Sequence, residues 1–132
     1  MRLNLLISDE WSIYEIDGTG RTIEDEYLKH GDDESGLFAL FEHVVSQKLG
    51  PTNLSTSMSH EIDKTNSLYE FVKGRYRVAY FIDDGKLIIC THCFYKKTGK
   101  TSKIDRKQAI RLKKSYLLAK SKKELEFSEE ED

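Results

Sequence analysis

The sequence of 132 residues has few cysteines and no long apolar run, and both shortages exclude classes of protein. Two cysteines are too few for the disulfide framework of a small secreted domain. No apolar segment approaches the roughly 18 residues of a membrane-spanning helix. The first residues, MRLNLLISDEW, become acidic too early for a secretory signal peptide. We therefore expect a cytoplasmic protein, and the length favours one domain.

Charge is abundant and is arranged in three blocks. The whole chain carries 21 basic and 23 acidic residues, a net charge of −2. The net charge is −9 over residues 1–70, +13 over residues 71–123 and −6 over residues 124–132. A basic block within an acidic chain predicts a surface that faces a polyanion. We assign residues 1–123 to the folded domain and residues 124–132 to an acidic, disordered tail.

Hydrophobic periodicity predicts two helices. Residues 37–49 carry one apolar stripe, with Asp33 or Ser35 as the cap and Gly50-Pro51 as the stop signal. Residues 104–119 form the second helix, whose core face holds Ala109, Leu112 and Tyr116. Its opposite face is basic and consists of Arg106, Lys107, Arg111, Lys113 and Lys114.

The centre of the chain has the pattern of β-strands. Strands are predicted over residues 3–7, 68–72, 76–82 and 86–95, and the last two are joined by a tight Asp-Gly turn. Both faces of residues 87–94 are apolar, so we expect this strand to be central and covered on both sides. Residues 52–66 are interpreted as a loop. A weaker turn signal at residues 17–20 suggests a hairpin between residues 13–16 and 22–23. The fold class expected is α+β, a small antiparallel sheet with helices packed on it.

A cationic patch should form at one end of this sheet. The turn at residues 83–85 brings the start of one strand beside the end of the next. The basic residues that gather there are Lys73, Arg75, Arg77, Lys96, Lys97, Lys100 and Lys103. Interleaved with them are Tyr69, Tyr76, Tyr80, Phe94 and Tyr95. Cations with aromatic rings suit RNA, since phosphates attract Lys and Arg while unpaired bases stack on rings. The alternative is a solvated basic face above core aromatics.

The segment Cys90-Thr-His-Cys93 suggests zinc or redox chemistry, but its context argues against both. Alternation along a strand would place the two thiols on opposite faces, and the chain has no second Cys-x-x-Cys pair. We interpret both cysteines as small core residues and expect no metal site. His92 could act as a general acid or base or hold a phosphate; alternatively, it is a buried, hydrogen-bonded histidine.

Residues 68–116 resemble the RelE/ParE superfamily of type II toxin–antitoxin toxins, within it the phage-derived Gp49-like, or HigB-like, branch. The features that carry the resemblance are Leu68-Tyr69-Glu70, Tyr76-Arg77-Val78, Tyr80, His92, Phe94, Lys96-Lys97-Thr98 and Lys100-Thr101, followed by a helix with Ala109 and Tyr116. The resemblance implies a compact RelE-like α+β fold and ribosome-dependent cleavage of mRNA without a metal or cofactor. In that reaction the ribose 2′-OH attacks the adjacent phosphate, which requires a base, an acid and cations for the developing charge.

The resemblance also implies roles for particular residues. Arg77 would stabilise the transition state, Arg75 would hold a neighbouring phosphate, and Lys96 and Lys97 would contact RNA and transfer protons. His92 is a secondary candidate for proton transfer. The residues expected to bind RNA are Lys73, Tyr95, Lys100 and Lys103. Some relatives carry basic residues where this chain has Leu68, Glu70 and Val72.

The implied partners are the ribosome with its mRNA and a cognate antitoxin, a helix-turn-helix DNA-binding protein. Operator DNA would be reached only through that antitoxin, and no membrane is involved. Two alternatives stay open. The chain could be a non-catalytic toxin of the same fold, or a phage-derived regulator that binds a protein or nucleic acid. Arg77 could equally form a structural ion pair with an acidic residue of residues 1–70.

Overall fold

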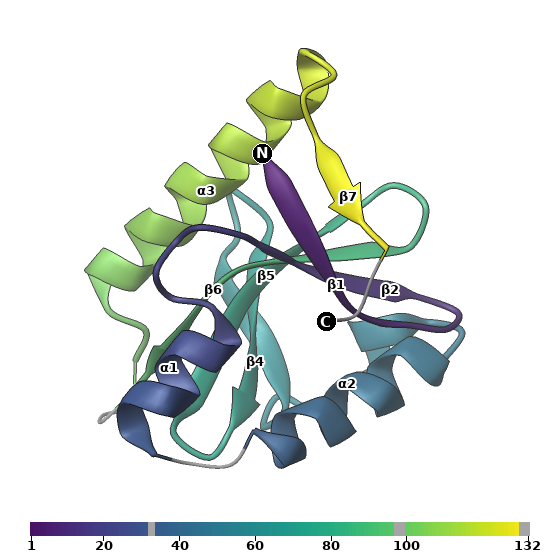
Figure 1. The fold of residues 1–132 in the computed structure, drawn as a ribbon. Helices are drawn as coiled ribbons and strands as arrows, with labels where there is room; N and C mark the ends of the chain where they lie inside the picture. Colours follow the sequence, from purple (N-terminus) through teal and green to yellow (C-terminus); the bar gives the residue numbers. More distant parts are fainter. Residues whose placement is uncertain (32–33, 97–99, 130–132) are drawn as a thin grey trace.

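A computed structural model describes residues 1–31, 34–96 and 100–129. They form one seven-stranded sheet with helices on both faces (Figure 1). The elements are β1 Arg2–Ser8, β2 Ser12–Ile16, α1 Ile23–His30, α2 Ser35–Ser46, the short 3-10 helix η1 Gly50–Asn53, β3 Ser59–Asp63, β4 Leu68–Lys73, β5 Tyr76–Asp83, β6 Leu87–Tyr95, α3 Lys103–Ser121 and β7 Glu126–Ser128. The α+β fold class predicted from the sequence is confirmed.

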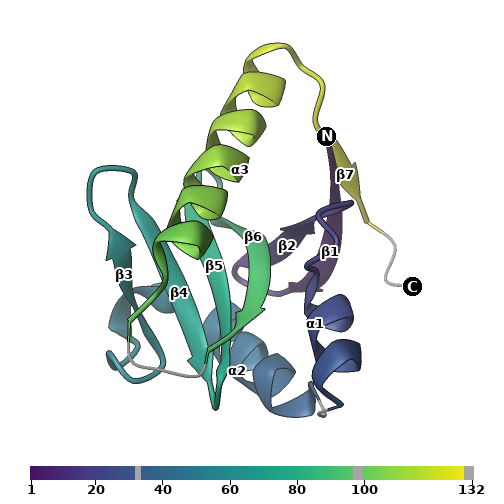
Figure 2. The same cartoon turned by 90° about the vertical axis from the view of Figure 1, so that its left-hand side faces the viewer.

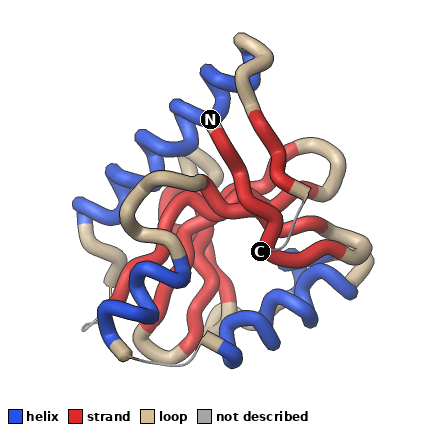
Figure 3. Tube along the Cα trace, in the orientation of Figure 1, coloured by secondary structure: helices blue, strands red, loops and turns tan. Residues whose placement is uncertain are grey.

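The strand order is β3-β4-β5-β6-β2-β1-β7. Strands β3 to β6 form an antiparallel meander, and β1 and β2 form an antiparallel hairpin. The sheet is nevertheless mixed, since β2 runs parallel to β6 and β7 runs parallel to β1. Parallel neighbours require a long connection, and the chain between β2 and β6 contains two α-helices, the 3-10 helix and three strands. Figure 3 shows these strands and the helices around them in one view.

The core has two layers, one on each face of the sheet. Helices α1 and α2 pack on one face with Trp11, Phe41 and Phe71, whereas α3 packs on the other with Phe81 and Tyr116. Figure 2 shows α3 and α2 on opposite sides of the sheet. Strand β6 is buried along almost its whole length, which confirms the prediction of a central strand covered on both sides.

The N-terminal region differs from its prediction. Thr22 does not belong to a hairpin. It caps α1 through a capping box with Asp25, so the expected pairing of residues 13–16 with 22–23 is wrong. Strand β2 pairs instead with β1 and β6. Helix α2 begins at Ser35 after the N-cap residue Glu34, and the other proposed cap, Asp33, lies outside the described residues.

Two further segments form strands that the sequence did not predict. Residues 59–63, within the expected loop, form β3 because β4 offers them a paired edge. Residues 126–128, within the expected disordered tail, form β7 along the outer edge of β1. There the ring of Phe127 packs edge-on against Tyr14, with 4.9 Å between centroids. Among the described residues of the tail, β1 supplies the backbone partners, and Tyr14 of β2 supplies the aromatic contact and a hydrogen bond to Glu129.

The two cysteines also depart from the expected alternation. The pairing of β5 with β6 shifts by one residue, so that Tyr80 lies opposite Cys90 while Ala79 lies opposite His92. Thr91 is the extra residue of this β-bulge. The bulge changes the phase of the strand, and Cys90 and Cys93 both enter the core on the α1 and α2 face. Burial raises the pKa of both thiols, which keeps them protonated.

Candidate functional site

The cationic end of the sheet is organised around one buried carboxylate, that of Glu70 on β4. The side chain of Glu70 is 0% exposed, yet three basic side chains converge on its Oε1 atom. His60 Nε2 lies 2.7 Å away, Arg77 Nε 3.6 Å and Lys96 Nζ 3.9 Å. Its other oxygen, Oε2, accepts a 2.9 Å hydrogen bond from Thr101. We call these five residues the Glu70 cluster.

Cross-strand pairing assembles this cluster from residues far apart in the sequence. His60 lies directly opposite Glu70 on the adjacent strand β3, and Arg77 enters from β5 one pleat further along. Lys96 follows the last residue of β6, and its backbone N–H donates to the carbonyl of Arg75 at 2.7 Å. Strands β4 and β6 finish, and β5 begins, at one end of the sheet (Figure 2). The charges of the cluster meet toward this end.

The carboxylate lies beneath its cations. The His60 side chain is 38% exposed, and those of Arg77 and Lys96 are 16% and 8% exposed. The His60 contact lacks the alignment of a hydrogen bond, so Glu70 Oε1 and Arg77 Nε are both buried without an aligned partner among the described residues. Burial lowers the pKa of Lys96, and the charge of Glu70 opposes this shift. A negative group fixed below three basic side chains holds them in place at a low-dielectric site.

Arg77 has further partners in its own strand and turn. Its NH1 donates to the carbonyls of Gly74 and Tyr76, at 2.8 and 2.9 Å. The ion pair with an acidic residue of residues 1–70, which the sequence left open, is therefore present, and Glu70 is its partner. Arg77 is thus rigidly held by contacts within the protein.

The other predicted cations surround the cluster at its solvent side. Lys73 is the last residue of β4, Arg75 lies in the turn before β5 rather than within the strand, and both are exposed. Lys100 and Lys103 are exposed at the start of α3. Lys97 lies outside the described residues. The described members of the predicted patch therefore lie around one end of the sheet, with Arg77 and Lys96 forming its inner part.

His92 lies apart from the Glu70 cluster in a second buried network. Its side chain is 0% exposed, and its Nε2 lies 3.3 Å from Asp105 Oδ1 at the start of α3. Burial lowers the pKa of His92, whereas Asp105 opposes that shift. Burial would raise the pKa of Asp105, but hydrogen bonds from His92 and Ser102 and the charge of Arg21 bring it to about 2. This environment is that of a buried, hydrogen-bonded histidine, the alternative to a role in proton transfer.

Tyr95 stacks within the protein. Its ring is parallel to that of His30 on α1, with 4.1 Å between centroids, and meets Tyr76 edge-on at 5.2 Å. Tyr76 in turn stacks on Tyr27 at 3.8 Å. A base that stacks on Tyr95 from the His30 side would have to displace that imidazole.

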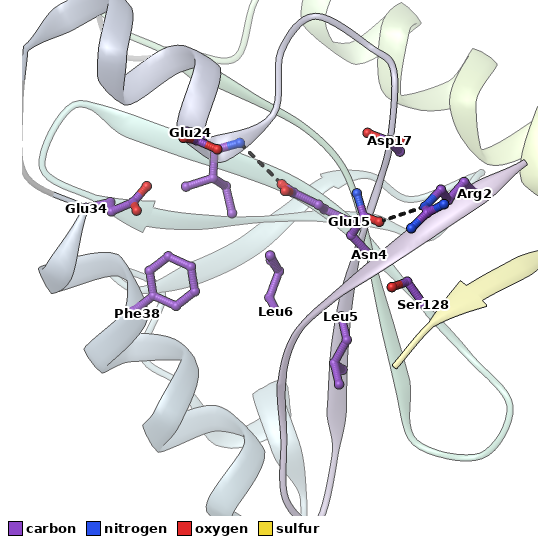
Figure 4. A pocket seen from close by; sticks show the side chains of 11 residues that line it. Arg2, Asn4, Leu5, Leu6, Glu15, Asp17, Glu24, Glu34, Phe38 and Ser128 are labelled. Carbon is purple, nitrogen blue, oxygen red and sulfur yellow. Dashed lines mark hydrogen bonds between the residues drawn. The ribbon is translucent and has the colours of Figure 1, made fainter. Parts of the chain in front are cut away.

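A hollow of about 410 Å³ lies elsewhere, between β1, β2 and the two helices of the same face (Figure 4). Four carboxylates line it, those of Glu15, Asp17, Glu24 and Glu34. Burial and the neighbouring Asp25, Asp17 and Glu34 raise the pKa of Glu15 to about 7, although the backbone N–H of Ile23 opposes the shift. An acidic lining repels polyphosphate, so this hollow does not suit RNA.

Neither a metal site nor a membrane helix is found in the part of the chain that the structure describes. There, no group of three or more His, Cys, Asp or Glu side chains is arranged to hold a metal ion. No helix in the same residues has both the length and the apolar character needed to cross a bilayer.

The Glu70 cluster thus adds three residues to the site that the sequence predicted: His60, Glu70 and Thr101. Glu70 and Thr101 belong to motifs that carry the family resemblance, but the sequence assigned no role to them or to His60. The contact of His60 with Glu70 arises from the β3–β4 register, which was hidden by the loop-like composition of residues 52–66. The only signal available was an acidic residue three positions before the basic turn at Lys73, within an otherwise apolar strand.

The fold and this site define a class: a single-domain α+β protein with a carboxylate-centred cationic cluster at one end of a mixed sheet. The chain belongs to the family Phage derived protein Gp49-like (DUF891), whose model matches residues 26–114, more than half of the chain. This is a RelE/ParE-like toxin family. The matched region runs from α1 into α3 and includes the whole Glu70 cluster. No curated protein matches the chain.

Proposed function

We propose that this protein is the endoribonuclease toxin of a type II toxin–antitoxin system, of the HigB-like branch, and that it cleaves mRNA on the ribosome. The observation that carries the proposal is the convergence of His60, Arg77 and Lys96 on Glu70, within a surface rich in exposed cations. Family membership supports a toxin. The cluster supplies the groups that phosphodiester transfer requires.

In the proposed reaction a base takes the proton of the ribose 2′-OH as its oxygen attacks the adjacent phosphorus, the bond from phosphorus to the 5′-oxygen breaks, and an acid protonates that oxygen. The products are a 2′,3′-cyclic phosphate and a free 5′-OH. Arg77 and Lys96 stabilise the negative charge that develops on the phosphoryl oxygens. Exposed Lys73, Arg75 and Lys100 hold the flanking phosphates.

Proton transfer is assigned to His60, in place of the buried His92. His60 is the most exposed of the three basic side chains on Glu70, and its Nδ1 faces the carbonyl of Thr56 at 3.1 Å. Its Nε2 lies 2.7 Å from Glu70 Oε1. An imidazole can donate a proton to the leaving 5′-oxygen. Lys96 is the second candidate for proton transfer, because burial lowers its pKa.

The test is induced expression in bacteria, with growth and primer extension on a reporter mRNA as readouts. We expect growth arrest and mRNA cleavage with the wild-type protein, and a loss of at least tenfold in cleavage with His60→Gln and with Arg77→Lys. Arg77→Lys keeps a positive charge beside Glu70 but loses the planar guanidinium group. Lys64→Ala, an exposed cation in the β3–β4 turn, is the control that should leave cleavage unchanged. Wild-type cleavage by both cluster variants would contradict the site.

The contacts of Arg77 within the protein favour an alternative to the nuclease. Its guanidinium already contacts Glu70 and two backbone carbonyls, as expected of a structural residue. In that case the protein is a non-catalytic toxin or regulator that binds its target through the exposed cations. Growth arrest with intact mRNA in the same experiment would support this function and exclude the nuclease.

The proposed partners follow from the toxin assignment. A ribosome presents the mRNA, and a cognate antitoxin with a helix-turn-helix domain neutralises the toxin and connects it to operator DNA. All of these would act in the cytoplasm. The basic segment should make antitoxin binding sensitive to salt.

A further inference from the structure

The outer side of α3 combines aliphatic and basic side chains in a way that the proposed nuclease does not use. Ile104 is 76% exposed near the start of the helix, and Leu117 and Leu118 are 46% and 56% exposed near its end. Ile104 and Leu118 are fourteen positions apart, which corresponds to about 21 Å along a helix. Figure 2 shows no described helix or strand over this outer side.

Cations occupy the stretch between the two aliphatic ends. Lys107, Arg111 and Lys114 are exposed and line a shallow hollow of about 400 Å³ together with Ile110 and Leu118. Among the described residues no carboxylate forms an ion pair with these three cations, and Arg111 donates only to Gln108, at 2.6 Å. We call Ile104, Lys107, Arg111, Lys114 and Leu118 the outer α3 surface.

The inward-facing lysines of the same helix are engaged, in contrast. Lys120 Nζ lies 2.8 Å from Asp83 Oδ1. Lys113 donates to the carbonyl of Asn66 and lies over the ring of Phe81, 5.2 Å from its centroid. Lys113 and Lys120 thus differ from Lys107, Arg111 and Lys114, for which no ion pair is found among the described residues.

The spacing favours one kind of occupant. A membrane would favour a continuous apolar face, whereas here three cations separate the two aliphatic ends. Nucleic acid would use the cations but gains little from exposed aliphatic side chains. A second copy of this helix would bring like charges together. We infer that the outer α3 surface binds an acidic amphipathic helix of a protein partner, with apolar side chains at both ends and carboxylates between them.

This inference is independent of the nuclease, because no residue of the Glu70 cluster lies on the outer α3 surface. The probe is a synthetic 21-residue helical peptide with Leu at the positions that face Ile104 and Leu118 and Glu at those that face the three cations. A peptide of the same composition in scrambled order is its control. Binding of each labelled peptide to the full-length protein is measured by fluorescence anisotropy at low and high salt.

We expect the patterned peptide to bind at least tenfold more tightly than the scrambled one, and the affinity to fall as salt rises. Leu118→Asp and Arg111→Glu should each weaken binding at least tenfold. Lys48→Glu, the same charge reversal at an exposed site beyond α2, should not. Circular dichroism confirms that the variants are folded. Leu118→Asp and Arg111→Glu should both leave mRNA cleavage by the protein unchanged.

Three results would overturn the inference. One is equal binding of the patterned and scrambled peptides, which would indicate charge attraction alone. Another is that Arg111→Glu weakens binding of a 20-nucleotide RNA or of anionic vesicles while the peptide does not bind, which would identify a different occupant. The third is a dimer at low salt that Arg111→Glu dissociates, which would identify a second copy of this chain.

Discussion

The replacement of Glu15 by Gln should stabilise the protein at alkaline pH and leave its stability unchanged in acid. Glu15 lies in the acidic hollow, where burial and then three neighbouring carboxylates raise its pKa from 4.5 to about 7 (Figure 4). Each pKa unit corresponds to about 1.4 kcal/mol, so ionised Glu15 costs the folded state at most about 3 kcal/mol. A glutamine keeps an oxygen that can accept the hydrogen bond of the Ile23 N–H.

The direction of this pH dependence follows from proton binding by Glu15. Because the folded-state pKa is raised, the stabilising contribution of the protonated side chain is fully present below pH 4.5 and is lost as the pH rises through about 7. Urea unfolding at pH 4 and pH 8 measures the free energy of unfolding of both proteins. The expected gain for Glu15→Gln is near zero at pH 4 and as much as about 3 kcal/mol at pH 8. Glu24→Gln, on the exposed rim of the same hollow, is the control and should show no such pH-dependent gain. An equal gain in the free energy of unfolding for Glu15→Gln at both pH values would refute the reasoning.

Three substitutions away from the site test the fold. Thr22→Ala removes the side-chain cap of α1 and should lower the free energy of unfolding by about 1 kcal/mol in urea titrations. Gly50→Ala places a Cβ 2.5 Å from the Trp11 ring at a positive φ, so a loss of about 1–3 kcal/mol is expected in the same assay. Phe127→Ala removes the aromatic contact of β7 with Tyr14 and should speed amide hydrogen exchange in residues 126–128, whereas an unchanged rate would mean that backbone pairing alone holds the strand.

The parts of the fold that the sequence predicted are those with strong local signals. Helix α2 has a long apolar stripe, and β5 and β6 are joined by an Asp-Gly turn. Helix α1 has eight residues and buries only Ile23, Glu26 and Tyr27, too few for a recognisable period. Strands β3 and β7 have polar or acidic sequences, and they form because β4 and β1 offer them a partner. Such pairing depends on tertiary structure and leaves little trace in the local sequence.

The candidate site also has a part that could be predicted from the sequence and a part that could not. The basic residues and the end of the sheet on which they lie could be predicted, because a hairpin pairs Arg77 with Phe94, two residues before Lys96. The carboxylate at the centre could not, because Glu70 gains its partners from β3, β5 and the region after β6. The orientation of the cysteines was missed for a related reason: a single bulged residue, Thr91, reverses the alternation of β6. Registers and bulges set these contacts, and neither can be read from residue spacing.

The most direct test of the Glu70 cluster is cleavage of a defined mRNA in a purified translation system, with stalled ribosomes present or absent. We expect that the wild-type protein cuts the mRNA only on ribosomes and leaves 2′,3′-cyclic phosphate ends, and that Arg77→Lys lowers the rate at least tenfold. The variant Arg77→Met leaves Glu70 paired with Lys96 and should be folded and inactive. Intact mRNA with the wild-type protein, or full activity in the folded Arg77→Met variant, would contradict the proposed role of the Glu70 cluster.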